Sequence, residues 1–229
     1  MRVVVLQSNY VPWKGYFDLI NDADVFCFYD EVQYTKNDWR NRNKIYSKNG
    51  LQWLTIPIHK EAVKHKISEV ELPLDWQKEH YKILQLSYSK APYFLQLKEL
   101  MDDLYIDFSC RTLSEFNHYS IKKIASYLGI TTRFVNSADY NLKSGKLDRL
   151  ISLLVELNAT EYITGPSAKD YLTDHEHLFA ENGIAHSYKN YEGYKPYKQL
   201  SEPFENSVSI LDLIANVERS EIKNHIWIK

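Results

Sequence analysis

Three short polar segments contain the residue types from which a site for a polar ligand could be built. They span residues 7–10, 30–34 and 165–169, and each follows a short apolar run. Amide side chains such as those of Gln7 and Asn9 both donate and accept hydrogen bonds, which suits the hydroxyl and carbonyl groups of a neutral ligand. We therefore predict that the three segments form one binding site.

The first segment continues into aromatic residues, and the whole chain is rich in them. It has eighteen tyrosines and five tryptophans but only seven glycines. Tyrosine combines a flat apolar ring with a polar hydroxyl, which suits sugars and nucleotides. We expect Tyr10, Trp13 and Tyr16 to offer stacking faces to a ligand. The alternative is that these rings cap the hydrophobic core.

The second segment leads into a basic run over residues 34–45. Arg40, Arg42 and Lys44 alternate with asparagines, so a strand would place these three cations on one face. Guanidinium groups suit the recognition of phosphates and carboxylates. A solvated edge strand is the alternative, but the aromatic residues in the run favour a binding surface that also includes Gln33, Tyr34 and Asn43.

The third segment supplies Gly165 and Lys169, with Tyr171 shortly after them. Lys146 is a further candidate, because Ser144 is a suitable N-cap that would place Lys146 in the first turn of a helix. A lysine there interacts unfavourably with the helix dipole, so a bound anion would account for it. An ordinary surface lysine is the alternative.

Other reactive side chains give weaker signals. His59 is a candidate general base, since imidazole titrates near neutrality, although a surface histidine would give the same pattern. His175 and His177 would point away from each other on a helix, so we expect no zinc site. Cys27 and Cys110 match neither a zinc spacing nor a nucleophile motif.

The elements that would position these residues indicate an α/β fold. Strand–helix–strand units occur twice, which predicts a Rossmann-like, mostly parallel sheet. In such sheets ligands bind beyond the carboxyl ends of the strands, where the three polar segments would meet. The expected strands are at residues 3–7, 25–29, 130–137, 160–165 and 184–189, with helices at 15–22, 144–159 and 209–216.

Two stretches interrupt this pattern. Residues 42–58 contain Asn49-Gly50 between two apolar arms, which is a strong β-hairpin signal. Residues 75–128 are mostly helical in pattern. We interpret the chain as one α/β domain over residues 1–229 with a helical insertion at about 75–128. Two lobes divided near residue 130 are the alternative.

The bulk composition narrows the class of protein. A formal net charge of -2 gives no basic surplus for binding nucleic acid. No apolar stretch approaches the ~18 residues that a membrane span needs, and the N-terminus has no signal-peptide features. The two distant cysteines fit a reducing compartment. We therefore expect a cytoplasmic protein that acts on a small molecule.

Residues 7–45 closely resemble the WbqC-like family, whose pattern runs roughly Q-x-N-Y-x-P-W-x-G-Y-F, followed by D-x-V-Q-Y and N-R-N. Ser8 stands where this pattern has proline. Cys27 stands where the family has an ordinary apolar residue, which argues against a cysteine nucleophile. The resemblance covers nearly the whole chain, because it continues through residues 50–58, 88–94, 146–172 and 209–214.

The resemblance implies a function through genomic context. Family members occur in gene clusters for bacterial O-antigen and other surface polysaccharides, which suggests N-acyl or aminoacyl transfer to a nucleotide-activated amino sugar. An acyl thioester on coenzyme A or an acyl-carrier protein would be the co-substrate, and no cofactor or metal would be needed. Asp30 or His59 would then be the base, and Gln7, Asn9 or a backbone amide would stabilise the oxyanion.

Two other functions stay open. Nucleotidylyl-type transfer on a phosphate substrate also uses a loop after the first strand, but its usual histidine pair is absent from residues 7–16. A non-catalytic sugar-nucleotide-binding protein would need the same aromatic and amide residues. Pyrophosphate release, thiol release and ligand-induced stabilisation distinguish the three functions.

Overall fold

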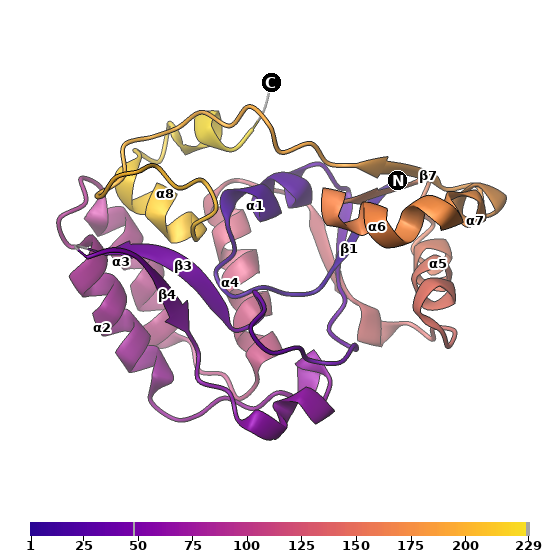
Figure 1. Cartoon of the computed structure of the whole chain (residues 1–229), viewed down its shortest axis with the longest axis horizontal. Coiled ribbons are helices and arrows are strands. Elements are labelled where there is room, and N and C mark those ends of the chain that lie inside the picture. The colour runs from indigo at the N-terminus through magenta and orange to yellow at the C-terminus, as the bar shows by residue number, and fades with distance from the viewer. Residues whose placement is uncertain (48, 228–229) are drawn as a thin grey trace.

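A computed structural model describes residues 1–47 and 49–227 of the chain (Figure 1). Within these residues the main sheet has the strand order β5-β2-β1-β6-β7, and each neighbouring pair is parallel. The predicted Rossmann-like α/β fold is thereby confirmed. The strands are β1 (Arg2–Leu6), β2 (Val25–Phe28), β5 (Arg133–Asn136), β6 (Glu161–Thr164) and β7 (Ala185–Tyr188).

Helices cover both faces of this sheet and form a hydrophobic core with each. Val4 of β1 belongs to one core and its neighbours Val3 and Val5 to the other, because successive side chains of a strand point to opposite faces. Figure 1 shows the helices of the second core to the right of β1. The first core includes α1 (Lys14–Asn21) and α4 (Leu113–Tyr127); the second includes α5 (Lys146–Glu156), α6 (Lys169–Leu172) and α7 (Glu176–Glu181).

The chain between β2 and β5 forms a group of elements beside the first core. The strands β3 (Arg42–Ser47) and β4 (Gly50–Thr55) form an antiparallel hairpin, which confirms the prediction made from Asn49-Gly50. Two helices follow it, and α4 then leads back to the sheet. The C-terminal helix packs against this group, on the left of Figure 1. These three helices are α2 (Trp76–Tyr88), α3 (Phe94–Asp102) and α8 (Ile210–Asn216).

The strand order creates a crevice at one edge of the sheet. β1 lies between β2 and β6. The chain leaves β1 for α1 on one face of the sheet but leaves β6 for α6 on the other face. The loops that leave β1 and β6 therefore diverge, which leaves space for a ligand between them. The polar segments at residues 7–10, 30–34 and 165–169 follow β1, β2 and β6 at this edge.

Two local predictions are wrong. The N-cap of α5 is Gly145 rather than Ser144, and its φ of 97° lies in the left-handed region that favours glycine. The cations Arg40, Arg42 and Lys44 do not share a strand face, because β3 begins only at Arg42. Arg40 instead lies in the preceding turn, so its side chain takes a different direction from the other two.

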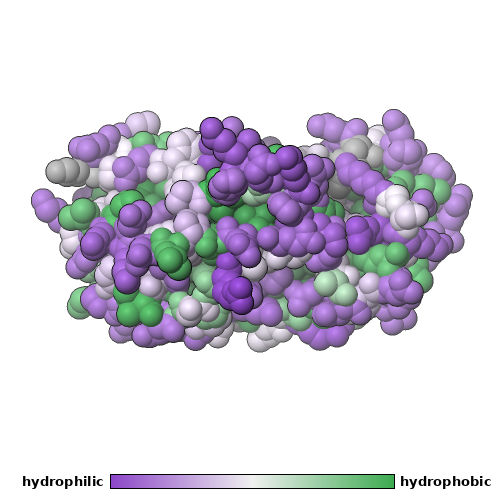
Figure 2. Space-filling view, turned by 90° about the horizontal axis from the view of Figure 1, so that it is seen from below, coloured by the Kyte–Doolittle hydropathy of each residue, from purple (hydrophilic) through white to green (hydrophobic). Residues whose placement is uncertain are grey.

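The surface carries its apolar residues in small groups. On the face seen in Figure 2, hydrophobic residues form separate patches between hydrophilic ones. None of the helices in the described part of the chain has the length and apolar character that crossing a membrane requires. Most of the large apolar side chains are instead in the two cores.

Candidate functional site

A large cleft lies at the carboxyl edge of the sheet. It has a volume of about 1050 Å³, and we call it the cationic cleft. Its walls come from the ends of β1 and β2, the segment that follows β2, and the start of α5. Its lining is Val5, Leu6, Gln7, Tyr29, Val32, Gln33, Arg40, Leu142, Lys143, Ser144, Gly145, Lys146, Arg149 and Ser167.

The lining contains four cations, Arg40, Lys143, Lys146 and Arg149, of which Arg40 also forms an ion pair with Asp38 at 3.4 Å. The Nε atoms of Arg40 and Arg149 are buried and have no hydrogen-bond partner among the described residues. The first turn of α5 reaches the cleft, and its N-cap Gly145 provides no side-chain cap for the N–H groups of this turn. Unpaired donors and the positive end of a helix dipole both favour an anion. The cleft is therefore suited to a phosphate-bearing ligand.

A smaller aromatic cavity adjoins the cationic cleft. We call it the tyrosine pocket; its volume is about 270 Å³, and it shares Val5, Tyr29 and Lys146 with the cleft. The Arg149 guanidinium carbon is 6.0 Å from the centroid of the Tyr29 ring. A flat apolar group could lie here beside an anion in the cleft. The remaining lining is Leu147, Leu150, Tyr162 and His175.

A third cavity lies next to the β1–α1 loop and the start of the hairpin. We call it the indole pocket, since two tryptophans line it, and its volume is about 260 Å³. Arg40 of the cationic cleft donates a hydrogen bond of 2.7 Å to the side chain of Asn9, which lines the indole pocket. This bond links one wall residue of each cavity. The lining is Asn9, Pro12, Trp13, Trp39, Asn43 and Ser207.

A buried polar network supports the loops of the cleft. Asp30 is 4% exposed and accepts four hydrogen bonds: from the Ser8 N–H (2.8 Å), the Ser8 hydroxyl (2.7 Å), the Ser114 hydroxyl (2.7 Å) and His118 Nε2 (2.8 Å). The His118 ring also stacks on Phe28, with centroids 3.9 Å apart. This Asp30 network fixes the loops after β1 and β2 to α4.

The same network reaches the cleft through Asn117. Its amide nitrogen donates to the Ser8 hydroxyl (3.2 Å) and to the Arg40 carbonyl oxygen (2.9 Å). On the other side, the Tyr16 hydroxyl donates to the Gln7 carbonyl oxygen (3.0 Å). The backbone positions of Gln7 and Arg40 are thus set by buried polar groups below the cleft.

Comparison with known proteins identifies the family. A profile of the WbqC-like protein family matches residues 7–224. The chain belongs to this family. It is 45% identical over 218 residues to "Uncharacterized protein Rv1507c" of Mycobacterium tuberculosis (strain ATCC 25618 / H37Rv), and the match covers 94% of each chain. No solved structure matches the chain.

In this WbqC-like protein, Asp30 is held by hydrogen bonds rather than open to a substrate. Burial alone would raise the pKa of its carboxyl, but the bonds from His118 and Ser8 outweigh burial and lower the pKa. The prediction that Asp30 contacts the substrate as a base has no support in this geometry. His59 does not line the cleft either, because it is exposed at the start of a short 3-10 turn, where its Nδ1 accepts from the Glu61 N–H.

The prediction of stacking faces is wrong for Tyr10 and Tyr16. Tyr10 is 0% exposed, and its hydroxyl bonds His80 Nδ1 and the Tyr105 hydroxyl, both at 2.7 Å. Tyr16 is buried against Phe26. Tyrosine is favoured in a core when its hydroxyl has a partner, so these rings are core residues. Trp13 does line a cavity.

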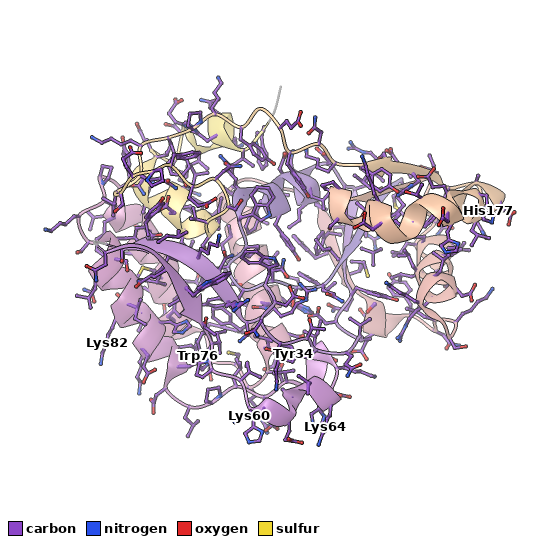
Figure 3. All side chains as sticks on the ribbon, in the orientation of Figure 1. Tyr34, Lys60, Lys64, Trp76, Lys82 and His177 are labelled. Atoms are coloured by element: carbon purple, nitrogen blue, oxygen red, sulfur yellow. The ribbon has the colours of Figure 1, made fainter. Side chains whose placement is uncertain are left out.

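The basic run divides between the cleft and the surface. The Arg42 guanidinium carbon lies 4.3 Å from the centroid of Trp53, away from the lining of the three cavities. Asn43 touches the indole pocket, but its amide nitrogen donates to the carbonyl oxygens of Tyr10 and Val11. Tyr34 is 3% exposed, next to the turn that carries Lys60 and Lys64 (Figure 3).

The predicted residues after β6 are only near the cleft. Gly165 begins the turn that supplies Ser167 to the lining. Lys169 is exposed, and its ammonium lies over the Tyr188 ring at 5.2 Å. The side chain of Tyr171 lies outside the described part of the structure. Of this group, Ser167 alone lines the cationic cleft within the residues that are described.

Several cleft residues were missed from sequence. Tyr29 is the last residue of the predicted strand 25–29 but follows β2 in the structure, and its position next to Asp30 indicates the carboxyl edge. Arg149 lies three residues after Lys146, which puts both on one side of a helix. That spacing was a usable signal. Lys143 carries no such signal. In the described residues, no group of three His, Cys, Asp or Glu side chains is arranged to hold a metal ion.

Proposed function

We propose that this protein is a cytoplasmic transferase of bacterial surface-polysaccharide biosynthesis, such as that of O-antigen, and acts on a nucleotide-activated amino sugar. The observation that carries the proposal is the row of four cations along one cleft, with the tyrosine pocket directly beside it. A nucleotide sugar has the matching parts: a flat base, a diphosphate and a polar ring. The family's occurrence in surface-polysaccharide gene clusters supports the same substrate class.

In this proposal the diphosphate lies between Arg40, Lys146 and Arg149. The unpaired Nε atoms of the two arginines become donors to phosphate oxygens. The base lies against Tyr29 in the tyrosine pocket, where an aromatic ring can stack on it. The Gln7 side chain in the cleft supplies an amide to a neutral polar group of the substrate.

The proposed reaction is N-acyl or aminoacyl transfer from a thioester. The sugar amine attacks the thioester carbonyl carbon, a C–N bond forms, and the C–S bond breaks. The departing thiolate takes up the proton that the amine loses, so the products are an amide and a free thiol. Gln7 or Asn9 donates a hydrogen bond to the oxyanion as it develops. Asp30 contributes indirectly, because its network positions the backbone of Ser8 and Arg40.

Two measurements on the full chain test the proposal. A thermal-shift screen of UDP, dTDP and GDP, each alone and with a hexose or amino-hexose attached, should reveal a rise in melting temperature for at least one nucleotide sugar. Incubation of an amino-sugar nucleotide with acetyl coenzyme A and other acyl-coenzyme A donors should release free thiol only when both substrates are present. If neither nucleoside diphosphates nor nucleotide sugars shift the melting temperature, the proposal is refuted.

One observation favours a second candidate, a non-catalytic sugar-nucleotide-binding protein. Among the described residues that line the cationic cleft, none is a carboxylate or an imidazole. A binding protein would be stabilised by a nucleotide sugar but would release no thiol. Nucleotidylyl-type transfer, the other alternative, would instead release pyrophosphate when a nucleoside triphosphate is added.

A further inference from the structure

Two indole rings and a proline ring form the apolar walls of the indole pocket. Trp39 is 40% exposed even though it is a large aromatic residue, and Trp13 is half-buried. Asn9 and Ser207 place polar groups at the same cavity. The pocket therefore combines flat apolar walls with a few hydrogen-bonding groups.

The Trp13 wall is preformed. Its ring lies so close to Gly15 that a Cβ added at this glycine would be 2.3 Å from an indole carbon. Tyr191 and Tyr194 pack edge-on to the indole, with centroids 5.0 and 6.0 Å away. The backbone of Trp13 is also bridged to Ser209. A ligand would meet this ring in a fixed position, which reduces the entropy lost on binding.

The hydrogen bonds of the polar side chains at the pocket show which of their atoms can donate to a ligand. Arg40 has only donors, so the Asn9 atom that it contacts is the amide oxygen, and the Asn9 nitrogen is the group of that side chain which can donate to a ligand. Asn43 is different, because its oxygen accepts from the Lys44 N–H and its nitrogen donates to Tyr10 and Val11. Asn9 and the Ser207 hydroxyl are thus the polar groups of the pocket that suit ligand hydroxyls.

We infer that the indole pocket binds a single monosaccharide ring, the sugar part of the nucleotide sugar. This inference rests on the proposed function for the diphosphate, but the pocket's own chemistry supports it. The C–H faces of a sugar ring stack on indoles, and its hydroxyls need donors and acceptors at the edge. Arg40 of the cationic cleft hydrogen-bonds Asn9 of the indole pocket, and in this inference the pocket takes the sugar while the cleft holds its diphosphate.

The tryptophans of this surface offer a matched pair of variants. Trp39 lines the pocket, whereas Trp53 is its neighbour with a centroid distance of 5.5 Å and does not line it. Both are exposed, at 40% and 46%, so Trp39→Ala and Trp53→Ala should both fold. Titration calorimetry would compare a nucleoside diphosphate with its sugar conjugate, for example UDP with UDP-glucosamine, on wild type and both variants. Changes in tryptophan fluorescence on addition of free glucosamine or galactosamine give a second measurement that needs no nucleotide.

We expect Trp39→Ala to weaken binding of the nucleotide sugar by about tenfold, which is the loss of one good aromatic contact. Binding of the bare diphosphate should change by less than about twofold, and Trp53→Ala should behave like wild type. If no nucleotide binds but free amino sugar still changes the fluorescence in wild type and not in Trp39→Ala, the proposed function fails and the sugar pocket stands. The inference is overturned if nucleotides bind but Trp39→Ala does not reduce the affinity gained from the sugar part. It is also overturned if wild type and Trp39→Ala give the same result with the nucleotide sugar and with the free amino sugar.

Discussion

The Asp30 network and the cationic cleft are adjacent polar regions. They differ in how far their hydrogen-bonding groups find partners within the protein. Every oxygen of Asp30 has a partner within the protein, and the residue is 4% exposed. The arginines of the cleft retain buried Nε atoms that have no hydrogen-bond partner in the described part of the chain. Both regions combine residues from the segment 7–45 with residues of a distant helix, which is α4 for the network and α5 for the cleft. They therefore have different physical roles despite their similar residue types.

This difference separates structural from functional polar residues. A buried polar group needs its hydrogen bonds to offset the loss of water, so a complete network stabilises the fold. Buried donors without partners lower stability unless a ligand completes them. On this criterion Asp30, Ser8 and His118 are positioning residues. Arg40 and Arg149 are candidate ligand-binding residues because they also line the cleft, whereas Arg42, whose Nε is likewise unpaired among the described residues, does not.

Asp30→Asn tests whether the Asp30 network stabilises the fold, and it should have the largest effect of the proposed substitutions. The amide can accept fewer of the four hydrogen bonds, and it brings two donors toward other donors, so we expect a loss of about 3 kcal/mol or more in the free energy of unfolding. Because the pKa of Asp30 is lowered in the folded state, its stabilisation is present above the ordinary pKa of 3.8 and is lost as the pH falls through the folded value. Urea denaturation of wild type and variant from pH 7 to pH 3 measures both effects.

Ser114→Ala is the matched control, because it removes one of the four bonds and keeps the charge. It should cost about 1 kcal/mol. A loss for Asp30→Asn as small as that for Ser114→Ala would mean that Asp30 is not the centre of the network.

Lys14 extends the comparison to a buried cation that has no hydrogen-bond partner among the described residues and lies outside the cleft. It is 2% exposed, its ammonium has no hydrogen-bond partner among the described residues, and it lies 4.7 Å from the Tyr194 ring centroid. Burial lowers its pKa from 10.5 to about 8. The difference of about 2.5 between these values corresponds to a penalty of about 3 kcal/mol at most.

Lys14→Met should therefore raise the free energy of unfolding at pH 7, by at most about 3 kcal/mol. The folded state binds the proton more weakly, so the wild-type penalty is complete below pH 8 and disappears as the pH rises through 10.5. Denaturation at pH 7 and at pH 10 should give a large gain for the variant at the lower pH and a small one at the higher. Equal gains at both values would contradict the buried charge.

Much of the fold could be predicted from the sequence because local patterns decide it. The continuous apolar runs at Val3–Val5 and Val25–Phe28 became adjacent buried strands, and Asn49-Gly50 marked the hairpin. The site could be predicted only in part. A tyrosine in a polar loop has the same pattern whether its hydroxyl meets a ligand or, as for Tyr10, a buried histidine. Partners such as His80, 70 residues away, are set by tertiary packing, which one sequence does not reveal.

Arg149→Gln tests whether the cationic cleft binds a phosphate-bearing ligand. Removal of this guanidinium should weaken binding of UDP or another responsive diphosphate by about tenfold, with a change below about 0.5 kcal/mol in stability, because the charge contributes to the ligand more than to the fold. Lys169→Gln is the control, since Lys169 also follows a carboxyl edge but does not line the cleft. Calorimetry at two salt concentrations should also show a weaker salt dependence for Arg149→Gln. Equal losses for both variants would indicate general surface charge instead of a site.

The smallest effect is expected for His59→Ala. A histidine is a suitable general base by its chemistry, and this variant tests whether His59 acts as one although it lies outside the cavities. His59 is exposed and does not line any of the three cavities, and its Nδ1 accepts a hydrogen bond of 3.3 Å from the Glu61 N–H. Its removal should change stability by less than about 0.5 kcal/mol and leave nucleotide-sugar affinity and any thiol release unchanged across pH 6 to 8. A loss of turnover with unchanged affinity would mean that the loop carrying His59 reaches the bound substrate. The cleft would then close over its ligand, and imidazole would supply the base that its described lining lacks.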